Sequence, residues 1–419
     1  MNRLLADAPK GAAIARRHFL ELGALSAAGL SAWPARAQQS AAASPLAEVT
    51  AKLEYLTKEE HFENAGRGTP PPCDLPLEKR REVGLVPETW QLEVLPDPES
   101  EAKVEHPLSR KLGTALTWDG LMKLAEKRAV RFPHVMSCTN GSRPFGMGLW
   151  EGVPLREVIW MAQPAANVRR VFYSGYHNDD PKQRFQSSLT IDRVLEDPPG
   201  EWPVILCYKL NGQWLTPKRG APVRMIVPDA YANKSVKWLQ RVVLTNKPQL
   251  NDTYAEWNND TESHLKTCAF FLQTPKTIRA GQSVPITGLA QVGMSGLSKV
   301  QYWLHPQEAT LPQGDSHYAK ADWRDADILP APARWGGGLP DGRLPADTLG
   351  LDPVTGQPRQ WPLRNSIVHW AALLTVSRPG KYDLRCRTID ANGFAQPMPR
   401  PLLKSGNNAI RKVVLAVEA

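Results

Sequence analysis

The spacing of apolar and polar residues divides most of the chain into two regions of different pattern. In the first region, runs that are continuously apolar or alternate between apolar and polar residues predict strands. Three short segments between them, residues 117–130, 154–162 and 190–197, have apolar residues at helical spacing and predict helices. The predicted strands are TWQLEV (89–94), HVMS (134–137), RRVFYSGY (169–176), PVILCYKLNG (203–212) and APVRMIVP (221–228). This mixture predicts an α+β domain over residues 60–250, preceded by a tail over residues 38–59.

The second region, residues 262–419, contains alternating runs separated by Gly, Pro and Asn turns, and no long helical pattern. Examples are QSVPITGLAQVG, SIVHWAALLTVS and GKYDLRCRTID. Short, regularly spaced strands of this kind predict an immunoglobulin-like β-sandwich. Residues 306–362 are rich in Gly and Pro and are expected to form long loops attached to it.

Residues 1–37 have the pattern of an export signal. Arg16 and Arg17 precede Phe19 and Leu20, a mildly apolar stretch follows, and Ala35-Arg36-Ala37 is a small-residue cleavage site. The pattern predicts twin-arginine export to the periplasm, a route that carries folded proteins, often with a cofactor already inserted. The alternative is a basic amphipathic helix. After this segment no run of 18 uncharged apolar residues occurs, so no membrane span is expected.

Net charge adds a constraint on the binding partner. The 419 residues have a formal net charge of +9. Removal of residues 1–37, which contain five basic and two acidic residues, lowers the net charge to +6. A moderately basic protein attracts small anions. Acidic and basic residues are interspersed and no basic run forms a nucleic-acid arm, so nucleic-acid binding is not expected.

The five cysteines are scattered at positions 73, 138, 207, 268 and 386. They form no C-x-x-C-H or C-x-x-C motif, so neither covalent haem nor a paired-cysteine metal site is expected. Cys138 follows a predicted strand and precedes the loop TNGSRPFGMG. It is a metal ligand, a partner in a distant disulfide, or an inert buried thiol. Cys207 is expected to be buried and inert, and a Cys268–Cys386 disulfide between strands of the sandwich is a further alternative.

The order of motifs then resembles a known family. The twin-arginine signal, the Cys138 loop, YSGYHNDD, GAPVRMIVPDAYANKSVKWL and the closing DANGFAQP together are similar to the sulfite oxidase family of molybdenum enzymes. The resemblance covers residues 60–419 and implies a molybdopterin-binding domain followed by a dimerisation domain. It also implies one pterin, a Mo atom with oxo groups, and Cys138 as the single protein thiolate on the metal. A soft thiolate suits such a metal.

The same resemblance implies which residues hold the cofactor. Its phosphate and polar ring edges require cationic and backbone donors. Arg219 and Arg224 match the family pattern most clearly, followed by the run Ser235, Val236 and Lys237. Phe62, Glu63 and Asn64 are expected to lie over the pterin, and His177 follows the YSGY turn at a cofactor-binding position.

For the substrate, Arg143, five residues after Cys138, is the predicted contact for a small anion. Phe185 stands where the family has a tyrosine near the metal, and it lacks the hydroxyl that donates to an oxyanion. Arg184 and Tyr176 are possible substitutes for that hydroxyl. Sulfite or a related anion is the expected substrate, oxidised by oxygen-atom transfer, with electrons passing to an external protein such as a c-type cytochrome. The alternatives are an S-oxide reductase resembling methionine sulfoxide reductase, and a cofactor-free binding protein.

Overall fold

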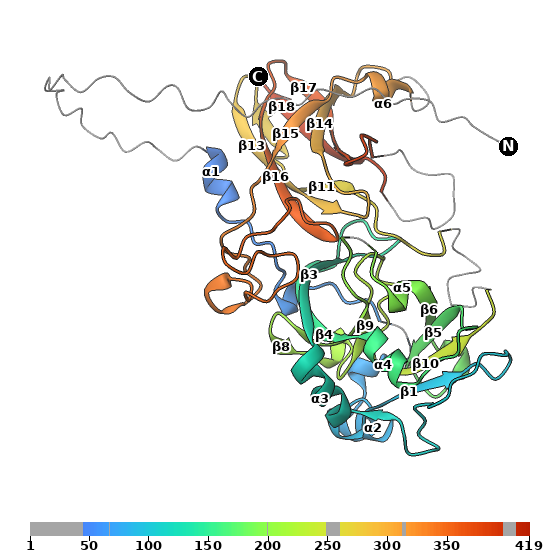
Figure 1. Ribbon diagram of the computed structural model, residues 1–419. Coiled ribbons are helices and arrows are strands. Elements are labelled where there is room, and N and C mark those ends of the chain that lie inside the picture. The colour runs from blue at the N-terminus through green and yellow to red at the C-terminus, as the bar shows by residue number, and fades with distance from the viewer. Residues whose placement is uncertain (1–44, 67, 199, 249–259, 312–315, 397–407) are drawn as a thin grey trace, which may run out of the picture. The chain divides into compact units, whose positions relative to one another are not determined.

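The structure is a computed structural model that describes residues 45–419 except 67, 199, 249–259, 312–315 and 397–407 (Figure 1). The predicted signal segment, residues 1–37, lies outside the described residues. Within the described ranges, every helix is too short or too polar to cross a lipid bilayer.

The first region contains a five-stranded sheet with the order β2-β1-β10-β5-β6. Strands β1 (Gln91–Pro96) and β10 (Leu239–Thr245) are parallel, and the other pairs are antiparallel. The other strands are β2 (Leu116–Thr117), β5 (Arg170–Gly175) and β6 (Gln186–Thr190). Because β1 and β10 are far apart in sequence, this sheet holds the ends of the region together.

A second sheet follows the order β3-β4-β7-β8, with β9 paired to β7. Its strands are β3 (Val130–Met136), β4 (Gly146–Pro154), β7 (Ile205–Leu210), β8 (Gln213–Trp214) and β9 (Arg224–Ile226). All nine residues of β4 are buried. Gly152 has a packing role here, since a Cβ atom would lie 2.3 Å from the Leu206 carbonyl oxygen.

Short helices connect these strands. Helix α3 (Trp118–Arg128) begins at Thr117, whose hydroxyl accepts a hydrogen bond from the Gly120 amide. The others are α2 (Leu77–Glu82), α4 (Leu155–Met161) and α5 (Ile191–Leu195). Helix α1 (Pro45–Thr50) lies within the predicted tail.

The second region is built from strands in the order β11-β13-β16-β15-β14-β17-β18-β12. Because β15 pairs with both β14 and β16, it joins the two halves of the sandwich. The strands of this region are β11 (Cys268–Gln273), β12 (Thr277–Arg279), β13 (Ser283–Val292), β14 (Lys299–Pro306), β15 (Arg324–Ile328), β16 (Ser366–Thr375), β17 (Gly380–Ile389) and β18 (Arg411–Glu418). The short helix α6 (Ser316–Lys320) precedes β15.

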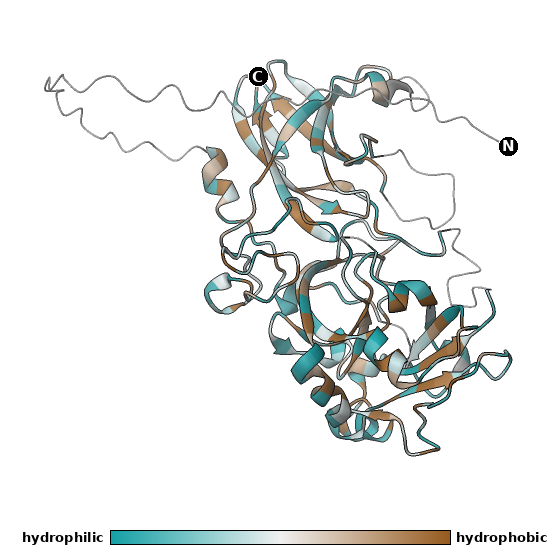
Figure 2. Cartoon of the chain, viewed as in Figure 1, coloured by the Kyte–Doolittle hydropathy of each residue, from teal (hydrophilic) through white to brown (hydrophobic). Residues whose placement is uncertain are grey.

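Each region has its own hydrophobic core. Leu92, Val171 and Leu239 belong to the core of the first, and Trp370 and Leu384 to that of the sandwich. Figure 2 shows hydrophobic residues recurring along the strands of both regions. Burial of these apolar faces is the main stabilising contribution to both regions.

The fold class predicted from the sequence, α+β followed by a β-sandwich, is confirmed. Local details differ. The predicted strand at 221–228 is only β9, and part of the predicted loop after Cys138 belongs to β4. Cys268 and Cys386 are both free and buried, so the alternative of a disulfide between them is not realised.

Candidate active site

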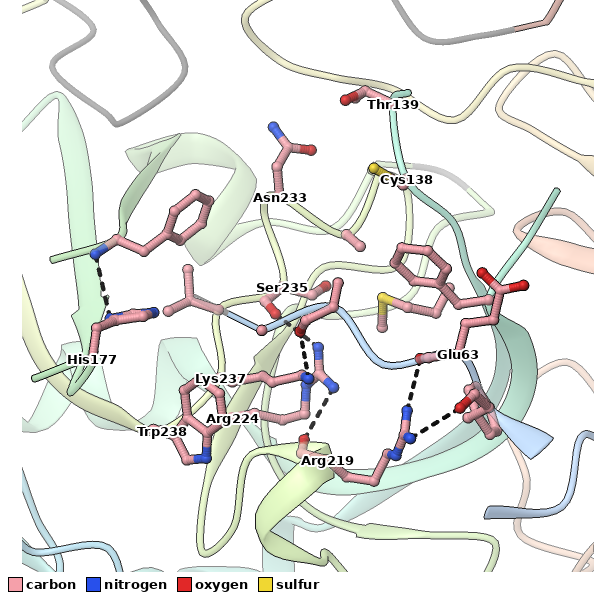
Figure 3. Close-up of a pocket in the computed structure, with 18 of the residues that line it drawn as sticks. Glu63, Cys138, Thr139, His177, Arg219, Arg224, Asn233, Ser235, Lys237 and Trp238 are labelled. Atoms are coloured by element: carbon pink, nitrogen blue, oxygen red, sulfur yellow. Dashed lines mark hydrogen bonds between the residues drawn. The ribbon is translucent and has the colours of Figure 1, made fainter. Parts of the chain in front are cut away.

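A cavity of about 290 Å³ lies in the first region, beside the ends of β3, β5 and β9. Its wall combines the N-terminal segment around Phe62, the loop after β3, the loop after β5, and the residues that follow β9. Figure 3 shows how side chains from these segments converge. The volume is near the lower limit of ~300 Å³ for small-molecule sites.

Cys138 lies two residues beyond the end of β3 and lines this cavity. The Gly141 amide donates to the Cys138 carbonyl oxygen at 3.2 Å, and the Phe145 amide donates to the Met136 carbonyl oxygen at 2.8 Å. These bonds close the loop tightly before β4 begins. The Ala232 amide donates to the Ser137 carbonyl oxygen at 2.8 Å, which brings the segment after β9 next to the thiol.

Arg219 joins the N-terminal segment to the wall of the cavity. Its side chain is buried and donates to the carbonyl oxygens of Phe62 and Glu63, both at 3.0 Å, and to the Glu59 carboxylate at 3.1 Å. Its guanidinium also lies 5.5 Å from the centre of the Phe62 ring. The predicted cofactor segment at Phe62 and Glu63 is therefore positioned by one of the predicted arginines.

Arg224, the first residue of β9, is only 3% exposed. It donates to the Arg219 carbonyl oxygen at 3.0 Å and to the Ser235 carbonyl oxygen at 2.8 Å, and stacks 5.2 Å from the Trp150 ring centre. Burial, together with the charge of Arg219, lowers the pKa of Arg224 to about 10. Ser235 in turn accepts from the Val227 amide, and the adjacent Val236 also lines the cavity.

Lys237 is the third cation of the cavity wall. Its ammonium donates to the Asn64 side-chain oxygen and to the Ala65 carbonyl oxygen, each at 2.7 Å. Burial, followed by the charges of Arg224 and Arg219, lowers the pKa of Lys237 to about 6. The structure thus gathers three basic side chains on one side of the cavity, with Asn64 behind Lys237.

His177 and Phe185 form the wall that follows β5. The Phe185 amide donates to His177 Nδ1 at 3.3 Å, and the imidazole packs edge-on against Trp238. The approach depends on Gly175, because a Cβ atom there would lie 2.0 Å from the Lys237 carbonyl oxygen. This contact explains the glycine of the YSGY turn in physical terms.

Arg143 is placed differently from the other predicted residues. Its side chain is 71% exposed, does not line the cavity, and forms an ion pair with Glu63 at 2.7 Å. The tight closure of the Cys138 loop leaves Arg143 on its outer side. This position of the Arg143 side chain, outside the cavity, does not support its predicted role as a contact for an anionic substrate.

Comparison with known proteins defines the region around this cavity. Residues 81–253 match the family described as oxidoreductase molybdopterin binding domain. The chain is 31% identical over 111 residues to a nitrate reductase [NADPH] of Beauveria bassiana, covering 26% of this chain and 12% of that protein. It is 30% identical over 175 residues to a nitrate reductase [NADPH] of Neurospora crassa, covering 36% of this chain and 16% of that protein.

Residues 81–253 are therefore similar to a molybdopterin-binding oxidoreductase domain. The chain spans about an eighth to a sixth of the length of these two nitrate reductases. Among solved structures, the sulfane dehydrogenase SoxCD of Paracoccus pantotrophus matches with a TM-score of 0.55 and 17% identity, over 80% of this chain and 79% of that chain. This likeness shows that the fold is shared, including the second region.

The larger cavity of the first region fits an anionic cofactor with polar edges. No carboxylate of the described residues forms an ion pair with the buried Arg224 or with the half-buried Lys237, whose pKa the charge of Arg224 lowers. Gathering like charges in a buried site is unfavourable unless an anion binds among them. The phosphate and ring oxygens of a molybdopterin supply such a partner.

Arg184 and Tyr176 line a separate cavity of about 100 Å³ in the first region, together with Glu93 and Arg241. His177 lines both cavities. Since neither Arg184 nor Tyr176 lines the larger cavity, the structure does not place them as substitutes for the hydroxyl absent at Phe185.

The sequence did not indicate several residues that line the larger cavity. Met136, Thr139 and Phe145 flank the cysteine, and Asn233 precedes Ser235 by two residues. Their only signal in the sequence is proximity to the predicted residues. Side-chain direction decides which neighbours reach a cavity, and a single sequence does not contain that information.

Proposed function

We propose that the chain is a molybdenum-dependent oxidoreductase that transfers an oxygen atom between a small substrate and a Mo centre bound by Cys138. The observation that carries the proposal is the convergence of one thiol with three basic side chains, Arg219, Arg224 and Lys237, on a single cavity. The match of residues 81–253 to a molybdopterin-binding domain supports it.

The chain's own residues have distinct roles in this proposal. The Cys138 thiolate holds the metal from the protein side, as a soft ligand suited to a redox metal. Arg219, Arg224 and Lys237 neutralise and orient the anionic part of the cofactor. The backbone groups of Ser235 and Val236 contribute at its polar edge, and Phe62, Glu63 and Asn64 form the wall beside it. When bound, the cofactor supplies two-electron oxygen-atom transfer to and from the substrate.

Several parts of the proposal rest on sequence patterns. Export through the twin-arginine route places the protein in the periplasm, and a one-electron carrier such as a c-type cytochrome exchanges electrons with it. Two copies pair through the sandwich region. Sulfite or a related small anion is the substrate that the family resemblance suggests, and S-oxide reduction is the alternative.

The decisive experiment is elemental analysis of the protein purified from a host that makes the molybdenum cofactor. The expected result is about one Mo per chain. Cys138→Ser should keep the fold and part of the pterin but lose the sulfur-to-metal absorption band and turnover. Cys73→Ser is the matched control, because Cys73 is also partly exposed but does not line the cavity. Absence of Mo, or a Cys138→Ser variant that is spectroscopically and catalytically unchanged, contradicts the proposal.

A further inference from the structure

Thr139 lies directly beside the predicted metal ligand, in a tight turn. The Gly141 amide donates to the Cys138 carbonyl oxygen at 3.2 Å, which closes a turn over residues 138–141 and makes Thr139 its second residue. Cys138 and Thr139 both line the larger cavity. In Figure 3 the sulfur of Cys138 and the hydroxyl of Thr139 lie on the same side of the chain. The turn therefore presents a thiol and a hydroxyl to one cavity.

The hydroxyl of Thr139 is available to a bound molecule. The residue is only 7% exposed, and its hydroxyl has no hydrogen-bond partner among the described residues. The hydroxyls of Thr287 and Thr348 also lack such a partner, but they are fully enclosed, whereas that of Thr139 stays accessible from the cavity. Without a ligand, an accessible hydroxyl binds water, and it loses this partner when a ligand displaces the water. The ligand must then supply an acceptor, because an unpaired buried hydroxyl is unfavourable.

Three other neutral donors of the cavity lining are used within the protein. The indole N–H groups of Trp150 and Trp238 donate to backbone carbonyl oxygens at 3.1 and 3.0 Å. The side-chain nitrogen of Asn233 donates to the Ser263 hydroxyl at 3.0 Å. Phe185 also lines the cavity, but its side chain has no polar atom. Thr139 is therefore the side-chain donor beside the thiol that remains for a ligand.

The basic side chains are placed for a different partner. Figure 3 shows Cys138 and Thr139 toward one side of the cavity and Arg219, Arg224 and Lys237 toward the other. The side of the three cations is the one assigned to the anionic part of the cofactor. The hydroxyl of Thr139 lies instead at the end of the cavity where the proposed reaction occurs.

We propose that the Thr139 hydroxyl donates a hydrogen bond to an oxygen atom of the substrate and holds that oxygen beside Cys138. Thr139 is then a substrate-binding residue. The inference rests on the proposed function, because that function places the reaction at the thiol. A hydroxyl is uncharged and has a single hydrogen, so it can serve the oxygen of an anion or of a neutral molecule.

The first measurement is the binding of phosphate, an unreactive oxyanion, to the Mo-loaded protein. Binding is followed by the change in the Mo(V) electron paramagnetic resonance signal during titration, so it does not depend on turnover. Thr139→Val removes the hydroxyl with little change in shape. It should keep the wild-type Mo content and weaken phosphate binding by about tenfold, the usual effect of losing one hydrogen bond. Thr139→Ser keeps the hydroxyl and should bind phosphate within about threefold of the wild type.

The second measurement is turnover, with sulfite and ferricyanide in one arm and dimethyl sulfoxide and reduced methyl viologen in the other. In the arm that the wild type catalyses faster, Thr139→Val should lower kcat/KM by about tenfold to a hundredfold, and Thr139→Ser by less than about threefold. The faster arm also shows whether the oxygen held by Thr139 belongs to an anion or to a neutral molecule.

Thr348→Val is the matched control. The hydroxyl of Thr348 is buried, has no partner among the described residues, and does not line the cavity. Its removal should leave phosphate affinity, Mo content and turnover unchanged. If Thr139→Val folds poorly, Thr139→Ala also removes the hydroxyl and is compared with Thr139→Ser.

Two results overturn the assignment of Thr139 while leaving the molybdenum enzyme in place. One is full Mo content with unchanged phosphate affinity in Thr139→Val. The other is an equal loss of affinity in Thr139→Val and Thr139→Ser, which assigns the effect to packing. Loss of Mo in Thr139→Val alone assigns the hydroxyl to the cofactor and also overturns the inference. A wild-type protein without Mo overturns the proposed function itself.

Discussion

Lys237 provides the sharpest test of how the cavity recognises its cofactor. Burial and the charges of Arg224 and Arg219 lower its pKa to about 6, so at pH 7 most of the free protein has a neutral lysine there. An anion bound beside Lys237 favours the ammonium form and raises the pKa again. Loading the cofactor then takes up a proton above pH 6, and its affinity must fall as the pH rises.

The magnitude follows from the pKa. Each pH unit above 6 adds about 1.4 kcal/mol to the free energy of protonating Lys237. Between pH 6 and pH 8, the cofactor affinity of the wild type should therefore fall by up to about 50-fold. The effect is smaller to the extent that water screens the ammonium.

The assay starts from protein made in a host that lacks the cofactor. Molybdopterin cofactor from a donor protein is added at pH 6 and pH 8, and bound Mo is measured against cofactor concentration. Lys237→Met should bind weakly at both pH values, with a much smaller ratio between them. Lys218→Met, an exposed neighbour, is the control and should keep the wild-type ratio. Titration of the cofactor itself affects all three proteins equally, so comparing the ratios removes it.

Equal ratios in wild type and Lys237→Met would refute the reasoning. A second consequence concerns stability without cofactor. The folded-state pKa of Lys237 lies below that of an unfolded lysine, so its destabilising effect is complete below pH 6 and disappears as the pH rises toward 10. Lys237→Met should therefore raise the melting temperature of the cofactor-free protein more at pH 6 than at pH 9.

Three more predictions test the framework around the site. Gly175→Ala should reduce Mo content and unfold at lower urea concentration, because its Cβ would lie 2.0 Å from the Lys237 carbonyl oxygen. Arg224→Lys keeps the charge but loses donors to two buried carbonyl oxygens, so urea unfolding should show a loss of about 1–3 kcal/mol. Burial raises the pKa of Glu201 to about 7. The ionised carboxylate therefore destabilises the folded protein increasingly as the pH rises from about 4.5 to 7. Glu201→Gln should raise the melting temperature more at pH 8 than at pH 5.

Local patterns predicted much of the fold. Helix α3 has a capping threonine and regularly spaced leucines, and strands such as β5 and β13 form apolar or alternating runs, so short-range sequence determines them. Strand β4 was only partly anticipated. It contains three glycines, all its residues are buried, and it shows no alternation, because its conformation depends on neighbours on both faces.

In the candidate site, too, some features could be predicted from the sequence and others depend on how the chain packs. The resemblance to the family grouped Cys138, Arg219, Arg224 and Lys237, and the structure brings all four to one cavity. It did not indicate that Arg143 points outward, because this follows from how the loop closes against β4. Nor did it indicate Asn233, whose orientation depends on a hydroxyl thirty residues away in the sequence.

The distribution of positive charge changes the meaning of the basic composition. From the sequence alone, a net charge of +9, or +6 after removal of the first 37 residues, favoured an anionic substrate. In the structure, the cations that reach the cavity are fixed by carbonyl oxygens and side-chain oxygens on the side opposite Asn233. The proposed anionic cofactor would account for those cations. The basic composition alone therefore does not identify an anionic substrate.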